Sequence, residues 1–378
     1  MSDRTRILHV LRAPVGGLFR HVLDLSGEQS ALGHDVGLVM DSTTADALTE
    51  RRIADIAPQL CLGVTRIPMS RLPGLGDLTA CRAVRDVAKA KRVDVLHGHG
   101  AKGGAYARLA GILLRRETGA RRVAIFYTPH GGSLHFPPRS PQGIIYIVVE
   151  RYLARHTDGL IFESDFARRV FDERVGKNLA EERVITNALQ PSDFITHVPE
   201  PDAADFLFVG ELRRLKGVDV LLNALAAIAQ QRPVSALIVG SGADREELEF
   251  LAADLDLENK VTFAGAMPAR EVFPRARCIV VPSRAESLPY IVLESAAARM
   301  PLLATNVGGI PEIVTGSDTP LLPPGDIRAL TSAMSRFLDA PEEARARAKR
   351  LQDVVYARFA IGSTTAAVLK FYADRLGR

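Results

Sequence analysis

Residues 206–239 read FLFVGELRRLKGVDVLLNALAAIAQQRPVSALIV, and this stretch indicates the fold class. Phe206–Val209 and Ser235–Val239 are short apolar runs that suit buried strands, and Val218–Ala229 between them has the composition of a buried helix. A strand, a helix and a second strand in this order form a unit in which the two strands are parallel and the helix covers one face. The stretch therefore predicts an α/β domain.

The same alternation continues on both sides of this stretch. Further strands are predicted downstream at Val261–Phe263, Cys278–Val281 and Leu302–Ala304. Upstream, apolar runs separated by helical stretches predict strands at Ile7–Leu11, Val36–Met40, Val93–His97, Val123–Tyr127 and Leu160–Phe162. The first helix places Leu18, Val22, Leu25 and Leu32 on one face and ends at Gly33. We therefore predict two doubly wound parallel sheets with helices on both faces.

A change in composition separates the two sheets. Prolines and acidic residues gather just after residue 190, at Pro191, Pro199 and Pro201 among others, which is typical of an interdomain linker. The sequence thus predicts an N-terminal α/β domain over residues 1–190, a linker over 191–204 and a C-terminal α/β domain over 205–361. The last helix, residues 362–378, is expected to pack back on the first domain.

The composition restricts the classes of partner. The chain has 378 residues, a formal net charge of +4 and no Trp, so aromatic stacking of bases or sugars on indole is excluded. Excess positive charge suits nucleic acid, an anionic membrane surface or anionic small ligands. Basic residues cluster at Arg115, Arg116, Arg121 and Arg122, after the apolar run Leu109–Leu114. The cluster is compatible with an anionic lipid surface or with a plain solvated surface, and no nucleic-acid motif accompanies it.

The compartment follows from the cysteines and from apolar run lengths. The three cysteines are isolated, without spacing for a disulfide framework or a zinc site. The polar segment Met1–Arg6 leads directly into a strand, so no signal peptide is expected. The longest apolar run, Ile144–Val149, is too short to span a bilayer. We expect a cytoplasmic protein, at most peripheral at the inner face of the plasma membrane.

The segment with the clearest chemistry is Ser283–Arg299, which reads SRAESLPYIVLESAAAR and follows a predicted strand. We expect a helix that begins near Ser287, with Pro289 in its first turn, whose free amides can hold an anion. Glu286 and Glu294 then lie beside the anion as acceptors for hydroxyl groups. A diphosphate between a sugar and a ribose matches this chemistry. The alternative is a surface helix with two solvated glutamates.

Other candidate residues also follow strands, where open parallel sheets bind their ligands. Lys216, in the turn after the strand Phe206–Val209, can reach a diphosphate as a flexible point charge. Gly16 and Gly17 lie in the first strand-to-helix turn, where glycine lets the backbone approach phosphate, although a simple tight turn is equally compatible. His97, His99 and His130 lie at strand ends beside glycines. This position is compatible with a role in binding or catalysis as well as with a structural role.

These segments together resemble the retaining glycosyltransferases of the GT-B fold, in glycosyltransferase family 4 (group 1). ESLPYIVLES stands where many members have EGFGLPVLEA, with two glutamates separated by seven residues. The run 206–314 also contains the Gly-x-Leu-x-x-x-Lys-Gly loop, VGSG, VTFAG and NVGGIPEIV, and the resemblance extends over essentially the whole chain. It implies two Rossmann-like domains facing across a cleft, a nucleotide-diphosphate sugar as donor, retention at the anomeric carbon, and no metal or other cofactor.

The resemblance also implies residue roles. Glu294 would bind the donor ribose and Glu286 the transferred sugar, while His130 would contact that sugar near the reacting carbon. The remaining donor-binding residues would be Gly16, Gly17, Arg213, Lys216, Ser287 and Leu288, and those on the acceptor side His99, Lys102 and Ser164. The turn at Gly308 and Gly309, between a strand and a helix, is interpreted as structural.

One departure from the family pattern affects the phosphate side of the site. Glu211 stands where the family usually has arginine, so Arg213 or Arg214 is expected to supply the missing charge. The form of the motifs is most similar to that of bacterial enzymes of exopolysaccharide or other surface polysaccharide synthesis, which implies a saccharide or lipid-linked saccharide acceptor. A nucleotide-sugar 2-epimerase of the same fold and a catalytically silent nucleotide-sugar-binding protein are the alternatives.

Overall fold

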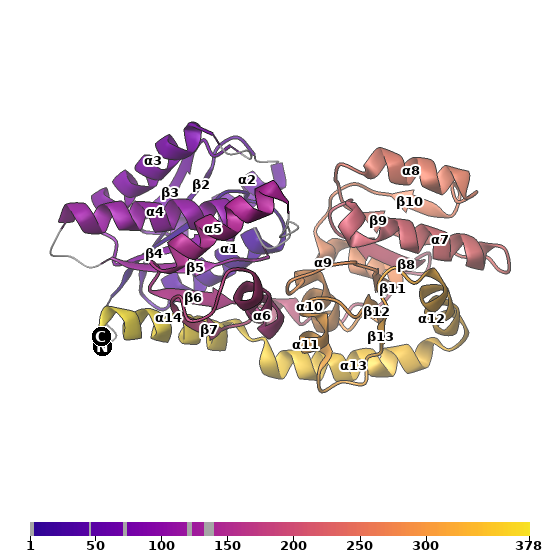
Figure 1. The fold of residues 1–378 in the computed structure, drawn as a ribbon. Helices are drawn as coiled ribbons and strands as arrows, with labels where there is room; N and C mark the ends of the chain where they lie inside the picture. Colours follow the sequence, from indigo (N-terminus) through magenta and orange to yellow (C-terminus); the bar gives the residue numbers. More distant parts are fainter. Residues whose placement is uncertain (1–3, 45–46, 71–73, 119–122, 132–139) are drawn as a thin grey trace. The chain divides into compact units, whose positions relative to one another are not determined.

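The computed structural model describes residues 4–44, 47–70, 74–118, 123–131 and 140–378. The chain divides into two compact units (Figure 1). The N-terminal unit comprises Met1–Ala188 together with Ile361–Arg378, and the C-terminal unit comprises Leu189–Ala360. Within the described residues, no helix is long and apolar enough to cross a membrane.

The sheet of the N-terminal unit has seven parallel strands in the order β3-β2-β1-β4-β5-β6-β7. β1 pairs with β2 on one side and with β4 on the other, so that Ile7 lies between Val36 and Val95. The direction in which strands are added therefore reverses at β1, and ligands of open α/β sheets bind at such a switch point. The strands are β1 (Arg6–Leu11), β2 (Asp35–Asp41), β3 (Gly63–Ile67), β4 (Val95–His99), β5 (Ala124–Thr128), β6 (Gly159–Phe162) and β7 (Glu181–Val184).

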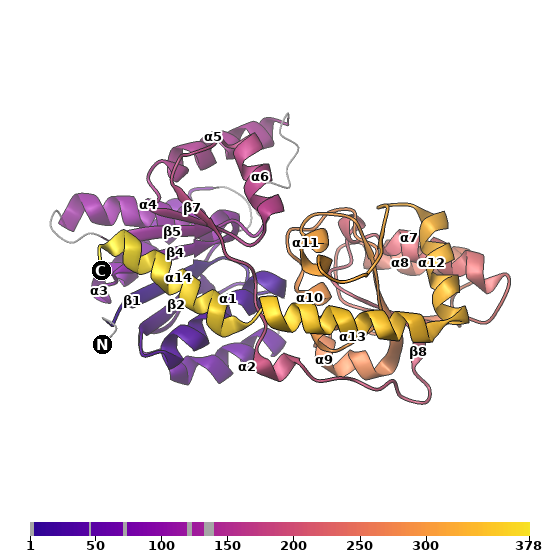
Figure 2. The ribbon, with the colours of Figure 1, turned by 90° about the horizontal axis from the view of Figure 1, so that it is seen from below.

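Helices cover both faces of this sheet because alternate strand residues point to opposite sides. Ile7 packs with the layer that contains α1 and α14, whereas Leu8 packs with α3 and α4. α14 lies beside α1 along the sheet (Figure 2). The helices are α1 (Gly16–Ala31), α2 (Ala47–Ile56), α3 (Gly76–Ala90), α4 (Gly100–Thr118), α5 (Pro141–Ala154), α6 (Asp165–Arg174) and α14 (Ile361–Leu376).

A buried ion pair joins α4 to α5. The guanidinium of Arg108, which is fully buried, donates from Nη1 to Glu150 Oε2 at 2.8 Å and lies 3.7 Å from the ring centroid of Tyr127. The Tyr127 hydroxyl donates to the other Glu150 oxygen at 3.2 Å. A charge without a partner is costly in such a site, so each member of the pair depends on the other.

The C-terminal unit has a six-stranded parallel sheet in the order β10-β9-β8-β11-β12-β13. Its strands are β8 (Ala204–Val209), β9 (Ala236–Val239), β10 (Val261–Phe263), β11 (Ala276–Val281), β12 (Leu302–Thr305) and β13 (Leu321–Leu322). Phe206 and Phe208 face α7, α8 and α12, whereas Leu207 and Val209 face α10 and α13. The helices are α7 (Val218–Ala229), α8 (Arg245–Asp254), α9 (Ala269–Val272), α10 (Tyr290–Ala297), α11 (Ile310–Val314), α12 (Ile327–Asp339) and α13 (Pro341–Arg358).

The prediction of two doubly wound parallel sheets is confirmed, with local differences. β4 extends to His99, two residues beyond the predicted end, because His97–His99 continue the register with β5. Leu32, expected on the buried face of α1, is 53% exposed because the helix ends at Ala31 and Leu32 is its C-cap. In the stretch predicted as a linker, residues 191–193 form a short 3-10 turn and the next residue, Phe194, packs on the core of the C-terminal unit.

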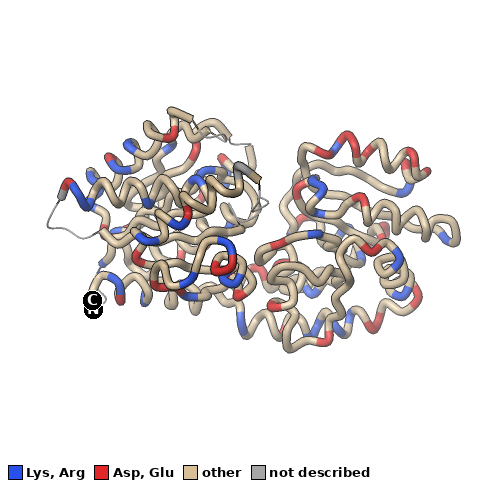
Figure 3. The backbone as a smooth tube through the Cα atoms, in the orientation of Figure 1, with Lys and Arg blue, Asp and Glu red and all other residues tan. Residues whose placement is uncertain are grey.

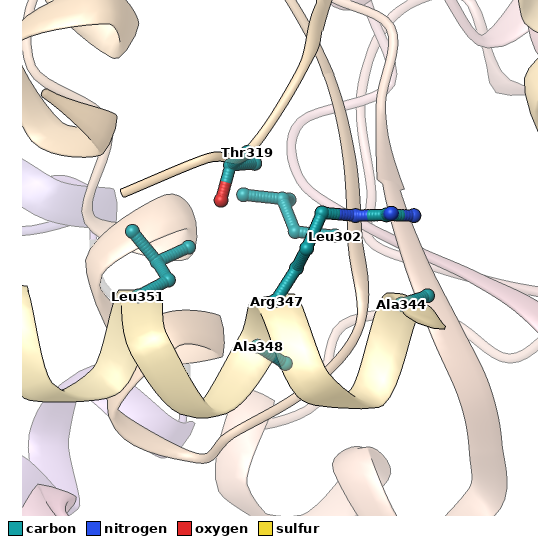
Figure 4. A pocket seen from close by; sticks show the side chains of 6 residues that line it. All are labelled: Leu302, Thr319, Ala344, Arg347, Ala348 and Leu351. Atoms are coloured by element: carbon teal, nitrogen blue, oxygen red, sulfur yellow. The ribbon is translucent and has the colours of Figure 1, made fainter. Parts of the chain in front are cut away.

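A small hollow lies against α13 in the C-terminal unit (Figure 4). It is lined by Leu302, Thr319, Ala344, Arg347, Ala348 and Leu351. Leu302 is the first residue of β12, so the hollow lies at the amino end of that strand. Ligands of open parallel sheets bind at the carboxyl ends, and the candidate residues of this unit also lie there.

Candidate functional site

The lysine loop, residues 210–217, follows β8 and closes against the segment that follows β11. Gly217 has φ +71°, and a Cβ atom at this position would lie 2.0 Å from the carbonyl oxygen of Pro282. Only glycine permits both the left-handed backbone and this approach. The Arg284 amide donates to the Leu215 carbonyl at 2.8 Å, which fixes the loop further. β8 and β11 are neighbours at the switch point of the sheet, so Lys216 lies where a ligand is expected.

Lys216 is ion-paired with Glu286. Its Nζ lies 2.7 Å from Oε1 and 2.9 Å from Oε2 of that carboxylate, and the Ser283 hydroxyl donates to Oε1 at 2.7 Å. The Glu286 side chain is only 8% exposed, whereas that of Lys216 is 27% exposed. A carboxylate this buried needs such partners, and the more accessible ammonium remains available to a second anion. The family resemblance implied separate roles for the two residues, whereas the structure joins them in one ion pair.

The glycine turn after β12 holds the backbone of Glu286 in place. Gly308 has φ +59°, and a Cβ atom there would lie 2.1 Å from the Glu286 carbonyl oxygen. The Gly309 amide donates to the Ser287 carbonyl at 2.6 Å, and the Thr305 hydroxyl donates to the Ser283 carbonyl at 2.6 Å. The turn has a structural role, as expected, and it supports the segment that carries Glu286.

The helix that carries Glu294 begins later than predicted. α10 starts at Tyr290, and Pro289 is its N-cap with an extended backbone (φ −73°, ψ 124°). The prediction of a helix start near Ser287 was wrong, since the bond to Gly309 holds Ser287 in the preceding loop. Leu288, expected to contact the donor, has its side chain in the core of the unit. Glu294 lies in the second turn of α10, as predicted, and is partly exposed.

The arginines of the lysine loop differ in what they contact. Arg213 lies 3.5 Å from Glu211, and both side chains are about half exposed. The Arg214 amide donates to Asp244 at 2.6 Å. Sequence reasoning missed Arg284, whose two terminal nitrogens each donate to Asp219 at 2.7 Å, although its place directly after a strand was a usable signal.

The carboxyl edge of the N-terminal sheet carries a second group of candidates. α1 begins at Gly16, which has φ +65°, and its N-cap Val15 provides no side-chain acceptor for the first amides. Gly16 and Gly17 are exposed, so these amides are accessible to an anion, which helix N-termini favour.

A cluster of five histidines, four of them buried and one half-buried, lies at the same edge. It comprises His9 on β1, His21 on α1, His97 and His99 on β4, and His130 after β5. His9 Nδ1 is 2.9 Å from His99 Nε2, and His99 Nδ1 is 3.2 Å from His130 Nε2. The sequence identified three of the five, whereas His9 and His21 were missed because β1 and α1 come next to β4 only through the sheet order. His130 has φ +49°, a strained backbone of the kind found at functional sites.

Burial keeps these imidazoles neutral. It lowers the pKa of His9 to about 4 and, with repulsion from His9, that of His21 to about 3. Burial, followed by repulsion from neighbouring imidazoles, lowers the pKa of His97, His99 and His130 well below the ordinary range. Neutral imidazole is the form that accepts hydrogen bonds and also the form that binds metal ions.

Two triplets of this cluster have the residue types of a metal site. They are His9 with His97 and His99, and His21 with His99 and His130, each with ring nitrogens within 4.8 Å of one another. In the first triplet, both ring nitrogens of His97 already have hydrogen-bond partners, the Tyr372 hydroxyl at 2.6 Å and the Thr128 hydroxyl at 2.9 Å, so neither is available to a metal ion in this arrangement. The separation of 2.9 Å between His9 and His99 is that of a hydrogen bond.

Two residues predicted on the acceptor side have structural partners. Lys102 forms an ion pair with Asp77 of α3 at 2.7 Å, so its charge is matched by a carboxylate. Ser164 is fully buried, and its hydroxyl accepts the Ala167 amide at 3.0 Å as the N-cap of α6. His99 is buried within the histidine cluster. A role for these residues toward an acceptor would therefore be indirect.

Family comparisons match both units. Residues 191–353 match the family described as glycosyl transferases group 1, and residues 16–188 match the glycosyl transferase 4-like domain. The chain belongs to the family 4-like glycosyltransferases. Among curated relatives of this glycosyltransferase, a glycogen synthase of Mycobacterium tuberculosis is 27% identical, with 95% of this chain and 91% of the relative covered. The putative glycosyltransferase EpsD of Bacillus subtilis is 29% identical, with 74% of this chain and 76% of the relative covered.

Solved structures show the fold of this glycosyltransferase to be GT-B. Sucrose-phosphate synthase of Thermosynechococcus elongatus superposes with a TM-score of 0.81 at 22% identity, covering 98% of this chain and 99% of that one. The Anabaena protein HepE, in complex with UDP and glucose, gives a TM-score of 0.81 at 19% identity, covering 98% and 100%. Both likenesses extend over the two parallel-sheet units described above.

Proposed function

We propose that this glycosyltransferase transfers a sugar with retention from a nucleoside-diphosphate sugar to a saccharide acceptor. The observation that carries the proposal is the contact of Lys216 with Glu286 between the carboxyl ends of β8 and β11. It pairs a partly exposed cation with a carboxylate that accepts hydroxyl hydrogens, and these are the groups that a sugar phosphate requires. The HepE structure bound to UDP and glucose supports the same ligand class.

Each donor group has a candidate partner. Lys216 would shift part of its interaction from Glu286 to the diphosphate, because a multiply charged anion competes well for an exposed ammonium. Glu286 would then accept hydrogen bonds from the transferred sugar, and Glu294, one turn into α10, from the ribose. The amides at the start of α1 would add partial positive charge for the phosphates. The glutamates lie on adjoining segments, as a ligand with two hydroxylated rings requires.

The proposed reaction depends on stabilising the diphosphate leaving group, and it needs no covalent intermediate with a side chain of the protein. The bond between the anomeric carbon and the diphosphate oxygen breaks, and the acceptor oxygen bonds to that carbon on the same face. The acceptor proton passes to the departing phosphate, so atoms and charges balance. Lys216 would stabilise the charge that develops on the diphosphate, so we propose that no metal ion is required. His130 would contact the transferred sugar through its ring.

The acceptor and the cellular location are inferred from the form of the sequence motifs and from one exposed helix face. We propose a lipid-linked saccharide of bacterial surface-polysaccharide synthesis, reached from the inner face of the plasma membrane. α5 presents an apolar face to solvent, formed by side chains that are 43–63% exposed: Ile144, Ile145, Val148, Val149 and Tyr152. An exposed apolar helix face of this size suits the boundary of a lipid bilayer.

The basic cluster at Arg115, Arg116, Arg121 and Arg122 offers less charge for binding anionic lipid than its sequence implies. Arg115 is ion-paired with Asp158 and also donates to the Val123 carbonyl at 2.7 Å. Arg116 is exposed, whereas residues 121 and 122 lie outside the described structure. Lys and Arg alternate with Asp and Glu along both units rather than gathering on one segment (Figure 3). The apolar face of α5 is therefore the main support for membrane contact.

Product analysis tests the proposed reaction. The protein is incubated with a panel of nucleoside-diphosphate sugars, with and without a lipid-linked saccharide extract, and the products are identified by mass spectrometry and NMR. We expect a glycosidic product of unchanged anomeric configuration, formed only with acceptor and undiminished by EDTA. Inversion at the anomeric carbon would refute retention. An epimerised nucleotide sugar formed without acceptor would establish the 2-epimerase alternative instead.

A further inference from the structure

The histidine cluster contains a continuous chain of hydrogen bonds that begins at a buried glutamine. Gln29 on α1 is fully buried, and its Oε1 lies 2.8 Å from His9 Nε2. His9 Nδ1 then contacts His99 Nε2 at 2.9 Å, and His99 Nδ1 contacts His130 Nε2 at 3.2 Å. Two imidazoles, those of His9 and His99, thus connect the side chain of Gln29 to His130.

A neutral imidazole carries one proton, so it donates with one ring nitrogen and accepts with the other. The Gln29 oxygen can only accept, which assigns the proton of His9 to Nε2 and leaves Nδ1 as an acceptor. His99 must then carry its proton on Nε2, and by the same reasoning so must His130. The direction of every bond in the chain follows from which end of the Gln29 amide faces His9.

We propose that Gln29 is a positioning residue that holds His130 in its Nε2-protonated tautomer, so that Nδ1 of His130 is a hydrogen-bond acceptor. His130 is the member at which the chain reaches solvent, because His9 and His99 are at most 1% exposed whereas His130 is only half-buried. If the amide were turned by 180°, its NH₂ group would face His9, every proton would move to the other nitrogen, and His130 would present a donor.

The second arm of the cluster is compatible with this amide orientation. Tyr372 on α14 is 2.6 Å from His97 Nδ1, and the other nitrogen of His97 is 2.9 Å from the Thr128 hydroxyl. Burial raises the pKa of Tyr372, and the nearby Gln29 side chain opposes that rise. With Oε1 toward His9, the NH₂ group of Gln29 is on the side of Tyr372, whose hydroxyl oxygen could accept from it, but the buried Nε2 forms no hydrogen bond within the described residues.

The consequence for the reaction rests on the proposed function. A hydroxyl group of the transferred sugar would donate to His130 Nδ1, and a hydroxyl always has a proton to donate. The opposite tautomer would require that hydroxyl to accept instead. Gln29 would thus determine, through three hydrogen bonds, whether His130 accepts from or donates to the sugar hydroxyl. The low pKa values of the histidines keep each imidazole neutral, so no second proton converts an acceptor nitrogen into a donor.

Nitrogen-15 NMR of histidine-labelled, ligand-free protein tests the tautomer directly. We expect His130 to be protonated at Nε2 in the wild type and in Ser26→Ala, a matched substitution of a fully buried side chain on the same helix. Gln29→Met, which keeps the size of the side chain but removes the acceptor, is expected to give a mixture of tautomers. A wild-type His130 protonated at Nδ1 would overturn the proposal even if Gln29→Met failed to fold. An unchanged tautomer in folded Gln29→Met would also overturn it.

Two further measurements separate this inference from its alternatives. In Gln29→Met, kcat should fall about three- to tenfold with little change in the donor KM, as expected for one misdirected neutral hydrogen bond, while Ser26→Ala keeps wild-type kinetics. A changed tautomer with unchanged kcat would refute the link to catalysis. One equivalent of zinc per chain, found by elemental analysis, would overturn the hydrogen-bond chain, since the metal would occupy the same lone pairs. A wild-type protein without transfer activity would refute the proposed function, and the NMR result would still stand.

Discussion

Mild acid should unfold the N-terminal unit before the C-terminal unit. The histidine cluster is neutral in the folded protein, with a pKa of about 4 for His9 and about 3 for His21. In the unfolded chain both residues return to an ordinary pKa of about 6.5. Below pH 6.5 the unfolded state therefore binds more protons than the folded state, and stability falls as the pH falls, until the folded pKa is reached.

The size of this effect follows from the same values. Between pH 7 and pH 5, a histidine that protonates only in the unfolded state lowers the free energy of unfolding by about 2 kcal/mol. His9 and His21 together give about 4 kcal/mol by this relation. His97, His99 and His130 shift in the same direction and add to the loss. Since domains are stable by only about 5–15 kcal/mol, this is a large part of the total.

Hydrogen exchange with mass spectrometry can follow each unit separately. The C-terminal unit contains a single histidine, His197, and serves as an internal control. After correction for intrinsic exchange rates, peptides from β1 and β4 should lose several kcal/mol of protection between pH 7 and pH 5, and peptides from β8 and β11 much less. Equal losses in the two units, or no loss in β1 and β4, would refute the argument from buried histidines.

Substitutions of Lys216, Gly308 and Glu150, with their controls, test the packing and the charges described above. Lys216→Met should weaken binding of a nucleoside diphosphate about 10- to 100-fold in calorimetry, and adding Glu286→Gln should restore the melting temperature but not the affinity. Gly308→Ala should lower the free energy of unfolding by about 2–4 kcal/mol in denaturant melts, because the new methyl group meets a carbonyl oxygen and φ is positive. Gly325→Ala, also at positive φ but with open space, should cost less. Glu150→Gln should cost about 3–5 kcal/mol by leaving its buried arginine partner without a counter-charge.

The apolar face of α5 makes a prediction about membranes. Val148→Glu should reduce co-sedimentation with vesicles rich in phosphatidylglycerol, while Phe250→Glu on α8, where the side chain is 75% exposed, should not. Equal effects of the two substitutions would contradict a specific lipid contact of α5.

The sequence predicted the parts of the fold that depend on local pattern. Apolar runs identified ten of the thirteen strands in the described residues and missed β3, β7 and β13. Turn residues placed Lys216 and Glu286 directly after strands. The start of α10 was misplaced because the proline in LPYIV suits a first helical turn, whereas a hydrogen bond from the distant Gly309 to the Ser287 carbonyl holds the preceding residues in a non-helical loop. Local preference could not reveal that bond.

The contents of the two sites depend on contacts between distant segments. His9 and His21 looked like ordinary residues of a strand and a helix, and they became part of a cluster only because β1 lies between β2 and β4. The pairing of Lys216 with Glu286 spans 70 residues of sequence, so spacing alone could not predict it. Lys102 was expected on the acceptor side, but it forms an ion pair with Asp77, which lies on another helix.

The central claim is that the C-terminal unit holds a nucleoside-diphosphate sugar with Glu294 on the ribose. Calorimetry with the best-binding nucleoside diphosphate of a panel, compared with its 2′,3′-dideoxy analogue, tests this directly. The wild type should prefer the natural nucleotide about 10- to 100-fold, the value of a hydrogen bond to a charged group. Glu294→Ala should bind both equally, whereas Glu211→Ala should keep the preference. An undiminished preference in Glu294→Ala would contradict the account.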